Sequence, residues 1–322
     1  MTRASGEPRL AVVALGGNAI QDPEGDDSVA SDFARTLETA KHLVALSLAG
    51  PWRIVVTHGN GPQVGNHLLR SELGHEHGDL PELPLDVCVA DTQGGMGYML
   101  QQSLSDSFHA AGVPAVVVAV VTQVVVEPDD PAFGDPTKPV GEILPDERAD
   151  EFRSKGWTLV KDERRGGWRR VVPSPDPREI VEAQAIKAMV QEGTIVVAAG
   201  GGGIPVVQAP DGSLHGRAAV VDKDLASALL AADLGADALL ILTDVEEVCL
   251  GFGTDEVEPL RELTVADAAR YLAAGEFPAG SMGPKVEAVR RFVSATGGIG
   301  TITSIERAED GLAGRAGTRV LP

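Results

Sequence analysis

The feature that most constrains the fold is a series of short apolar runs, each rich in Val, Ile or Leu. The runs span residues 10–15, 53–57, 115–126, 194–198, 237–243 and 299–305. Their apolar residues follow one another almost without interruption, whereas a strand with one face in solvent alternates apolar and polar residues. Strands that are buried on both faces are typical of parallel sheets. The runs therefore predict a mostly parallel central sheet.

Helical patterns lie between these runs. One apolar stripe consists of Phe33, Leu37, Ala40, Val44 and Leu48. Similar stripes, with the spacing of an amphipathic helix, follow Asp224 and Pro284. Strands that alternate with helices predict an α/β sandwich. The length of 322 residues suits either two lobes or one large domain.

One segment, residues 127–177, departs from this alternation. It contains eight of the 21 prolines of the chain. Within it, residues 158–160 and 168–172 flank the sequence Arg165-Gly166-Gly167, as two strands flank a turn. We interpret residues 127–177 as an inserted subdomain or lid, with an extended surface loop as the alternative.

Composition and charge restrict the classes of partner. The formal net charge of -20 opposes binding to nucleic acid or to an anionic membrane, because both are polyanions. There is no apolar run of ~18 residues that could span a bilayer, and the first ten residues lack the apolar core of a signal peptide. Cys88 and Cys249 show no paired spacing. We expect a soluble cytoplasmic protein without nucleic-acid or membrane partners.

Three of the apolar runs end in glycine clusters. The clusters are Gly16-Gly17-Asn18, Gly59-Asn60-Gly61 and Gly200-Gly201-Gly202-Gly203. Glycine lets backbone amides approach an anion without an intervening side chain, especially before a helix N-terminus. Ligands of open parallel sheets bind at the carboxyl ends of the strands. The clusters therefore predict a phosphate-binding site.

Two common phosphate-binding motifs do not account for this pattern. The spacing of Gly59, Gly61 and Gly65 superficially resembles a dinucleotide fingerprint. That fingerprint needs a second strand with an acidic end about 20 residues further on, whereas residues 72–84 are polar, contain glycine and proline, and read as a loop. The Gly-Lys-Ser/Thr sequence of a P-loop is also missing. We infer that the phosphates are held in another way.

Lysine is scarce, with seven residues against 20 arginines, so its positions are informative. Lys223 and Lys285 lie near predicted helix N-termini, and Pro284 fits the first position of its helix. A cation is unfavourable there unless an anion binds beside it. Lys138 lies between two prolines of the insertion, which could stiffen a loop that carries this charge to the site. We found no metal-binding motif: His75-Glu76-His77 reads as part of a solvated loop.

These residues belong to longer motifs. In chain order they are ALGGNAI, THGNGPQVGN, ADTQGGMGY, TQVVVEP followed by PTKPVG, GWRRVVPSP, GGGGIPVV, VVDKDLAS and GSMGPK. The set resembles the carbamate kinases, within the amino acid kinase family, over residues 9–320. The resemblance implies one domain over residues 1–322, a three-layer αβα sandwich and a homodimer. It also implies a role in arginine metabolism and reversible phosphoryl transfer between ATP and carbamate with Mg²⁺. Carbamoyl phosphate is a mixed anhydride, so ATP synthesis should be favoured.

The resemblance also implies roles for individual residues. Lys138, Lys223 and Lys285 would be catalytic, with Asp224 organising them. Carbamate and the transferred phosphoryl group would be bound by Gly16, Gly17, Asn18, Gly59, Asn60 and Gly61. ATP or ADP would be bound by Gly200, Gly201, Gly202, Gly203, Thr243, Val245, Val248 and Met282. Thr254-Asp255 departs from the family, whose members often carry Lys-Pro there, and the lost positive charge should alter nucleotide affinity or choice.

Two alternatives stay open at this point. One is a kinase of the same family that acts on another small acid, such as acetylglutamate or a phosphonate. A larger acceptor would need a cationic anchor for its distal group, and the sequence does not identify one. The other is a nucleotide sensor without turnover, which the intact lysines and Asp224 oppose.

Overall fold

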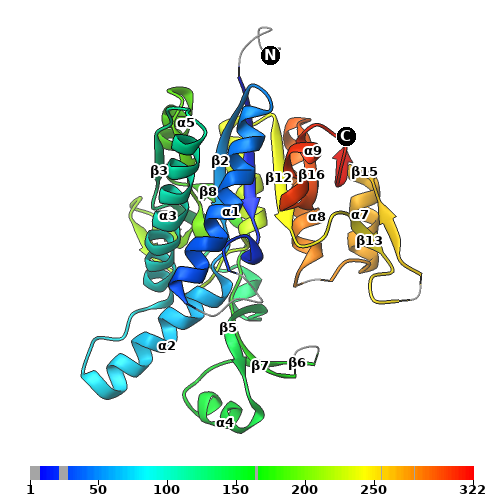
Figure 1. Ribbon diagram of the computed structural model, residues 1–322. Helices are drawn as coiled ribbons and strands as arrows, with labels where there is room; N and C mark the ends of the chain where they lie inside the picture. Colours follow the sequence, from blue (N-terminus) through cyan, green and yellow to red (C-terminus); the bar gives the residue numbers. More distant parts are fainter. Residues whose placement is uncertain (1–7, 22–27, 164–165, 255, 279) are drawn as a thin grey trace.

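The computed structural model describes residues 8–21, 28–163, 166–254, 256–278 and 280–322, without the side chain of Asn18. Its centre is an eight-stranded sheet with the order β15-β17-β16-β12-β1-β2-β9-β3 (Figure 1). Neighbouring strands run parallel except β16 and β17. The strands are β1 (Arg9–Leu15), β2 (Trp52–His58), β3 (Val117–Ala119), β9 (Ile195–Val197), β12 (Ala238–Thr243), β15 (Glu262–Thr264), β16 (Ile299–Ser304) and β17 (Thr318–Leu321).

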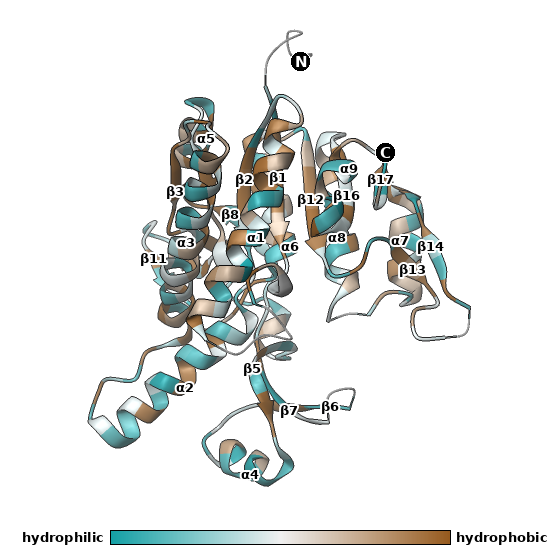
Figure 2. Cartoon of the chain, in the orientation of Figure 1, coloured by the Kyte–Doolittle hydropathy of each residue, from teal (hydrophilic) through white to brown (hydrophobic). Residues whose placement is uncertain are grey.

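Helices cover both faces of this sheet, as the side chains of β1 show. Val13 and Leu15 pack into a core with α1 (Val29–Leu48), α3 (Leu85–Ala110) and α9 (Ala308–Leu312). Val12 and Ala14 point the other way, into a core with α5 (Ala183–Gln191), α6 (Lys223–Leu234), α7 (Val265–Ala274) and α8 (Met282–Thr296). Apolar colouring is concentrated on the strands between the helix layers (Figure 2). The predicted three-layer α/β sandwich is confirmed.

The apolar run at 115–126 forms two strands rather than one. After β3 the chain leaves the central sheet and enters a second sheet, of order β11-β10-β4-β8. Its strands are β4 (Gln123–Val126), β8 (Pro177–Ile180), β10 (Ile204–Gln208) and β11 (Leu214–Gly216). At the break, the buried side chain of Gln93 accepts from the Thr122 amide at 2.8 Å and donates to the Thr122 carbonyl at 3.0 Å. A side chain thus supplies the hydrogen bonds of a missing neighbouring strand.

Three smaller predictions were wrong. Residues 72–78, expected in a loop, belong to α2 (Gly61–Gly78), which ends where Asp79 takes the left-handed conformation. On α1, Leu37 and Leu48 are exposed, because the helix buries Leu43 and Leu46 instead. α8 begins at Met282, two residues before Pro284, which is possible because the first-turn amides of a helix need no partner within the helix.

A separate small sheet, with the order β5-β7-β6, lies beyond the central sheet and beside α2 (Figure 1). It contains β5 (Lys138–Leu144), β6 (Leu159–Asp162) and β7 (Gly167–Val172), and α4 (Asp146–Ser154) packs on it. Val64 and Leu68 of α2 share a core with Val140 and Val172. The remaining elements are the hairpin β13 (Val248–Leu250) and β14 (Glu258–Leu260), and the short helices η1 (Gly17–Ala19), η2 (Pro131–Phe133), η3 (Gly200–Gly202) and η4 (Ile305–Arg307).

Among the described residues, no helix is both long enough and apolar enough to cross a bilayer.

Candidate functional site

A cavity of about 600 Å³ opens at the carboxyl ends of β1, β2 and β12, which are neighbours in the sheet. It brings together most of the residues predicted for phosphoryl transfer. Its walls include Gly16, Gly17, Gly59, Asn60, Gly61, Lys138, Gly201, Lys223, Asp224, Thr243 and Lys285. These residues come from segments separated by more than 250 positions in the sequence, so the fold assembles the site.

Two of the lysines share one carboxylate. Lys223 Nζ lies 2.5 Å from Asp224 Oδ1, and Lys285 Nζ lies 2.9 Å from Asp224 Oδ2. Lys223 and Asp224 are the first two residues of α6, whereas Lys285 lies in the first turn of α8. The Asp224 side chain is only 4% exposed. Asp224 therefore fixes two ammonium groups from different helices at one wall of the cavity.

The pKa values follow from this sharing. Burial lowers the pKa of Lys223 to about 8, and the pull of Asp224 offsets this only in part, because Lys285 repels the same charge. Burial also opposes the charged form of Lys285, but Asp224 outweighs it and raises the pKa of that lysine. Burial alone would raise the pKa of Asp224, yet the two ammonium groups hold it well below its ordinary value. One buried carboxylate thus serves two cations, so this group of three side chains carries a net positive charge on one wall of the cavity.

Lys138 reaches the cavity from the small sheet. It is the first residue of β5 rather than part of the expected loop. Its Nζ lies 2.5 Å from Asp222 Oδ2. The other carboxylate oxygen of Asp222 accepts from the Asp224 amide at 2.9 Å, which makes Asp222 the N-cap of α6. Lys138 and Lys223 are therefore held at the same helix N-terminus.

Gly17 and Gly61, in the first two glycine clusters, leave space next to the cavity, whereas a Cβ atom at Gly16 would lie 3.1 Å from the Leu242 carbonyl oxygen. A Cβ atom added at Gly17 or Gly61 would meet no atom within 4 Å. A Cβ atom at Gly59 would lie 3.4 Å from Cδ of Lys223, an ordinary contact. These glycines leave their backbone open to a ligand, as the sequence predicts for a phosphate-binding loop.

The third cluster is packed against protein. Added Cβ atoms at Gly201 and Gly202 would lie 2.2 Å from Asn60 Nδ2 and 2.3 Å from the Val221 carbonyl oxygen. Gly201 contributes to the cavity wall, whereas Gly200, Gly202 and Gly203 line neither cavity described here.

Buried polar residues support the loop after β2. Asn60 Nδ2 donates to Thr92 Oγ1 at 2.9 Å, so α3 orients this side chain. His58 Nδ1 lies 2.9 Å from the Gly59 carbonyl oxygen, which fits a neutral ring that donates this hydrogen bond. Burial lowers the pKa of His58 to about 4, and repulsion from Lys223 contributes. His58 thus adds no positive charge near the cavity at neutral pH.

A second cavity, of about 580 Å³, adjoins the first and shares Thr243, Asp244 and Lys285 with it. Val245 and Met282, predicted to contact the nucleotide, line it. Asp162 and Arg169 of the small sheet also belong to its wall. Lys285 therefore lies on the walls of both cavities.

Val248, which was also predicted to contact the nucleotide, lines neither cavity. Val248 is fully buried in the core that contains α6 and α8, and its amide donates to Thr318 Oγ1 at 2.8 Å. The side chain of Asn18 and all of Asp255 lie outside the described part of the chain.

The sequence analysis missed other residues of the first cavity, namely Asp222, Arg35, Asp244 and Glu306. Asp222 carried a detectable signal, because Asp directly before an apolar helical stripe is a preferred N-cap. Arg35 supplies a further cation on the cavity wall. No local signal marks Arg35 of α1, which is brought to the cavity only by the fold.

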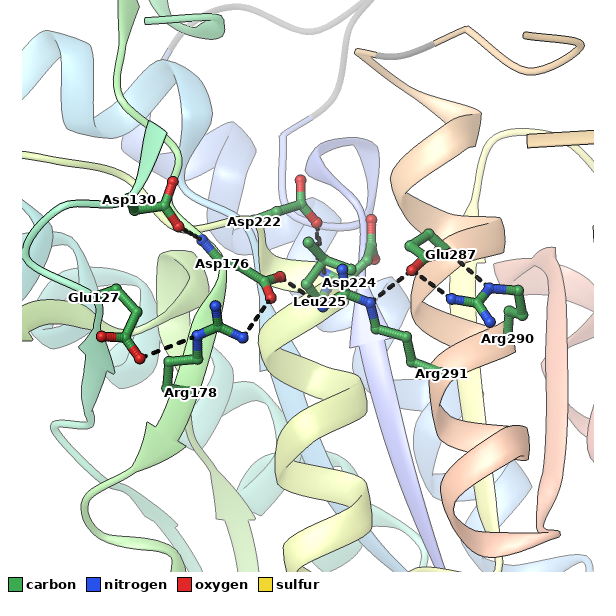
Figure 3. Close-up of polar contacts among 10 residues, drawn as sticks. All are labelled: Glu127, Asp130, Asp176, Arg178, Asp222, Asp224, Leu225, Glu287, Arg290 and Arg291. Atoms are coloured by element: carbon green, nitrogen blue, oxygen red, sulfur yellow. Dashed lines mark hydrogen bonds and ion pairs between the residues drawn. The ribbon is translucent and has the colours of Figure 1, made fainter. Parts of the chain in front are cut away.

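Ion pairs join the base of the insertion to α8 (Figure 3). Asp176 accepts from Arg291 at 2.6 Å, and Arg291 also donates to Glu287 at 2.7 Å. The Asp176 amide donates to Asp130 Oδ2 at 3.0 Å, which links the two ends of the insertion. The segment that carries Lys138 is therefore tethered to the helix that carries Lys285.

Within the described residues, no group of three or more His, Cys, Asp or Glu side chains is arranged to hold a metal ion.

Comparisons with known proteins agree with this geometry. The model of the amino acid kinase family matches residues 9–302. Carbamate kinase of Halobacterium salinarum is 48% identical over 97% of this chain and 98% of its own length. Carbamate kinase of Pyrococcus furiosus is 45% identical over the same shares. The structure of carbamate kinase from Giardia lamblia bound to AMP-PNP superposes with a TM-score of 0.87, at 39% identity, over 98% of both chains.

The ordered motifs, the three-layer sandwich and these similarities over nearly the full length lead to one conclusion: the chain belongs to the amino acid kinase family, and within it to the carbamate kinases.

Proposed function

We propose that this chain catalyses reversible phosphoryl transfer between ATP and carbamate, giving ADP and carbamoyl phosphate. The observation that carries the proposal is the convergence of Lys138, Lys223 and Lys285 on one cavity next to open glycine loops. Phosphoryl transfer requires little covalent assistance from the protein and depends on positioning and charge neutralisation.

In this proposal the first cavity holds carbamate and the transferred group. Backbone amides of Gly17 and Gly61 bind oxygens of the phosphoryl group, with Asn18 and the Gly59-Asn60 segment beside them. The Gly16 amide donates to the Leu242 carbonyl at 3.1 Å, so Gly16 contributes to the wall of the site rather than a donor. The lysines neutralise the charge that spreads over the phosphoryl oxygens in the transition state. Asp224 keeps Lys223 and Lys285 in place before the substrates arrive, so little reorganisation is needed during the reaction.

The second cavity holds the nucleotide. Thr243, Val245 and Met282 line it, and Lys285, on the walls of both cavities, reaches toward the phosphates from there. The Giardia lamblia relative bound to AMP-PNP, an adenine nucleotide, supports this assignment. Gly200, Gly202 and Gly203 would act indirectly, by packing behind the site, and Val248 by forming the core beneath it.

Mg²⁺ enters as part of the nucleotide substrate in this proposal. It would neutralise phosphate charge, and Asp244 on the shared wall is a carboxylate available to bind it. We further propose that the protein works as a cytoplasmic homodimer, as the family resemblance implies, with a role in arginine metabolism.

The test is an assay of the purified full chain in both directions. With ADP, Mg²⁺ and carbamoyl phosphate we expect rapid ATP formation, and slower carbamoyl phosphate formation from ATP and carbamate. Acetylglutamate with ATP serves as the comparison substrate, because Arg35 is a cation on the cavity wall. Absence of ATP formation at high enzyme concentration, or faster turnover of acetylglutamate than of carbamate, would contradict the proposal.

A further inference from the structure

We propose that Asp222 is a positioning residue for Lys138: it holds the ammonium group so that the remaining N–H bonds face the phosphoryl site. The inference rests on the proposed function, since it names the phosphoryl group as the ligand of Lys138. Asp222 would thus do for the lysine of the small sheet what Asp224 does for Lys223 and Lys285.

Asp222 and Asp224 make similar contacts, because each uses both of its carboxylate oxygens. Asp224 uses both oxygens on lysines, at 2.5 and 2.9 Å. Asp222 uses one oxygen on Lys138, at 2.5 Å, and the other on the Asp224 amide, at 2.9 Å. The hydrogen bond to the start of α6 prevents the Asp222 side chain from turning away. The oxygen that accepts from Lys138 is therefore held in a fixed position at the edge of the cavity.

Lys138 needs such a partner more than the other two lysines do. Its side chain is 26% exposed, against 11% for Lys223 and 14% for Lys285, so surrounding protein restricts it less. A free lysine side chain loses rotamer entropy when it is ordered. An ion pair formed before the substrate binds removes part of that cost from the binding step. An ammonium group has three donors, so one bond to Asp222 leaves two for the phosphoryl oxygens.

The pair also spans two parts of the molecule. Lys138 begins β5 of the small sheet, whereas Asp222 caps a helix that packs on the central sheet. The ion pair thus connects the small sheet to the wall of the cavity. The connection is made by Lys138, the residue proposed to bind the phosphoryl group. Loss of the pair would free the Lys138 side chain without removing it.

The competing interpretation is that Asp222 is only a helix cap. Asp222→Asn separates the two roles, because asparagine caps helices about as well as aspartate but carries no charge. The first measurement uses an amine-reactive reagent on the folded chain, with peptide mass spectrometry to follow each lysine. We expect Lys138 to be modified about fivefold faster in Asp222→Asn, as for the loss of a partly exposed ion pair. Asp222 also favours the charged forms of Lys223 and Lys285. Because Asp224 still pairs with both, their modification rates should rise less than that of Lys138.

The second measurement is a double-mutant cycle with Lys138→Met, using ADP, Mg²⁺ and carbamoyl phosphate. We expect Asp222→Asn alone to lower kcat/KM on the order of 10- to 100-fold, as for a misplaced catalytic group, with an unchanged unfolding midpoint. In the Lys138→Met background the same change should cause no further loss, because Asp222 would act through a side chain that is no longer present.

Two results would overturn the inference: equal labelling of Lys138 in both proteins, or losses that multiply in the double variant. The labelling arm needs no turnover. An inactive wild-type enzyme would therefore refute the proposed reaction, and would still leave the Asp222–Lys138 pair to be judged by the labelling rates.

Discussion

The glycine clusters after β1 and β2 and the cluster after β9 look alike in sequence but differ in structure. Gly17 and Gly61 have free space where a side chain would begin. Gly201 and Gly202 have positive φ angles of 64° and 87°, and a Cβ atom there would collide with Asn60 or Val221. The first two clusters provide an open surface for a ligand, whereas the third provides the tight packing that supports it.

This difference teaches that a glycine-rich strand end has two separate physical causes. Near a ligand, glycine leaves room for something that the protein itself does not contain. Within the protein, glycine permits a left-handed backbone and a close approach between segments. Substitution by alanine distinguishes them, because the first kind should cost activity and the second kind stability.

Among the changes that compare the two kinds of loop, the largest effect is expected for Gly202→Ala. The new methyl group would lie 2.3 Å from a backbone carbonyl oxygen, which cannot move aside cheaply, and the backbone would be held in the left-handed region. The left-handed conformation costs about 1–2 kcal/mol and the overpacking about 1–3 kcal/mol. We expect the free energy of unfolding, measured with denaturant, to fall by about 3 kcal/mol or more.

Gly212→Ala is the matched control for this substitution. Gly212 has the same φ of 87°, but a Cβ atom there would meet nothing within 4 Å. It should lose only the conformational part, about 1–2 kcal/mol. Equal losses of unfolding free energy in Gly202→Ala and Gly212→Ala would show that the close packing of Gly202 against Val221 contributes little to stability.

The next largest effect is expected for Gly17→Ala, on activity. The added methyl group would occupy the space assigned to the phosphoryl group, so kcat/KM should fall about 10- to 100-fold, equivalent to about 1.4–2.7 kcal/mol of transition-state stabilisation. The free energy of unfolding should change by less than about 0.5 kcal/mol. Gly78→Ala, at the far end of α2, should leave both quantities close to wild type. If Gly17→Ala lowered the free energy of unfolding but not kcat/KM, Gly17 would serve packing rather than ligand binding, and the contrast between the two kinds of loop would be wrong.

The open loops also predict a pH dependence through Lys223, whose side chain packs beside Gly59. Its pKa is lowered to about 8, so kcat/KM should fall about tenfold per pH unit above that value as the positive charge is lost. The contribution of Lys223 to the free energy of unfolding should instead increase as the pH rises. Between about pH 8 and the ordinary lysine pKa of 10.5, the unfolded chain binds the proton and the folded chain does not. Lys223 therefore makes the fold more stable as the pH rises through that range.

Initial rates and denaturant unfolding from pH 7 to 10 test this directly. A kcat/KM that stays flat to pH 9.5 would show that the charge of Lys223 is not needed.

The smallest effect is expected for Thr92→Val, which probes the contact between the two kinds of loop. Asn60 lines the cavity, packs against Gly201 and donates to the Thr92 hydroxyl group. Loss of the acceptor should cost about 1 kcal/mol of unfolding free energy, with a loss of activity below about tenfold. Thr92→Ser keeps the hydroxyl group and should behave as wild type. A larger activity loss in Thr92→Val than in Gly17→Ala would mean that Asn60 binds the ligand more strongly than the backbone does.

The sequence was sufficient to predict the central sheet, because strands buried on both faces need nearly continuous apolar residues. It also located Lys223 and Lys285, since cations at helix starts conflict with the helix dipole and so stand out. The break at Thr122 could not be foreseen, because the hydrogen bonds that stabilise it come from Gln93, about 30 residues away. Arg35 was missed for a similar reason, as its position at the cavity depends on how α1 packs.

The two kinds of glycine could not be separated from the sequence either. Whether a Cβ atom would meet empty space or the Val221 carbonyl is decided by segments that are distant along the chain. Lys138 was identified, but its partner Asp222 lies 84 positions away, so no local pattern connects them.

The central claim is that the lysines around the open glycine loops carry out phosphoryl transfer. The most direct test is the kcat for ATP formation from carbamoyl phosphate and ADP with Mg²⁺, compared between wild type and Lys285→Ala. We predict a loss on the order of 100- to 1000-fold, as for removal of a charge-stabilising donor, in a protein that remains folded at the assay temperature. A kcat within about tenfold of wild type in the folded variant would contradict the account.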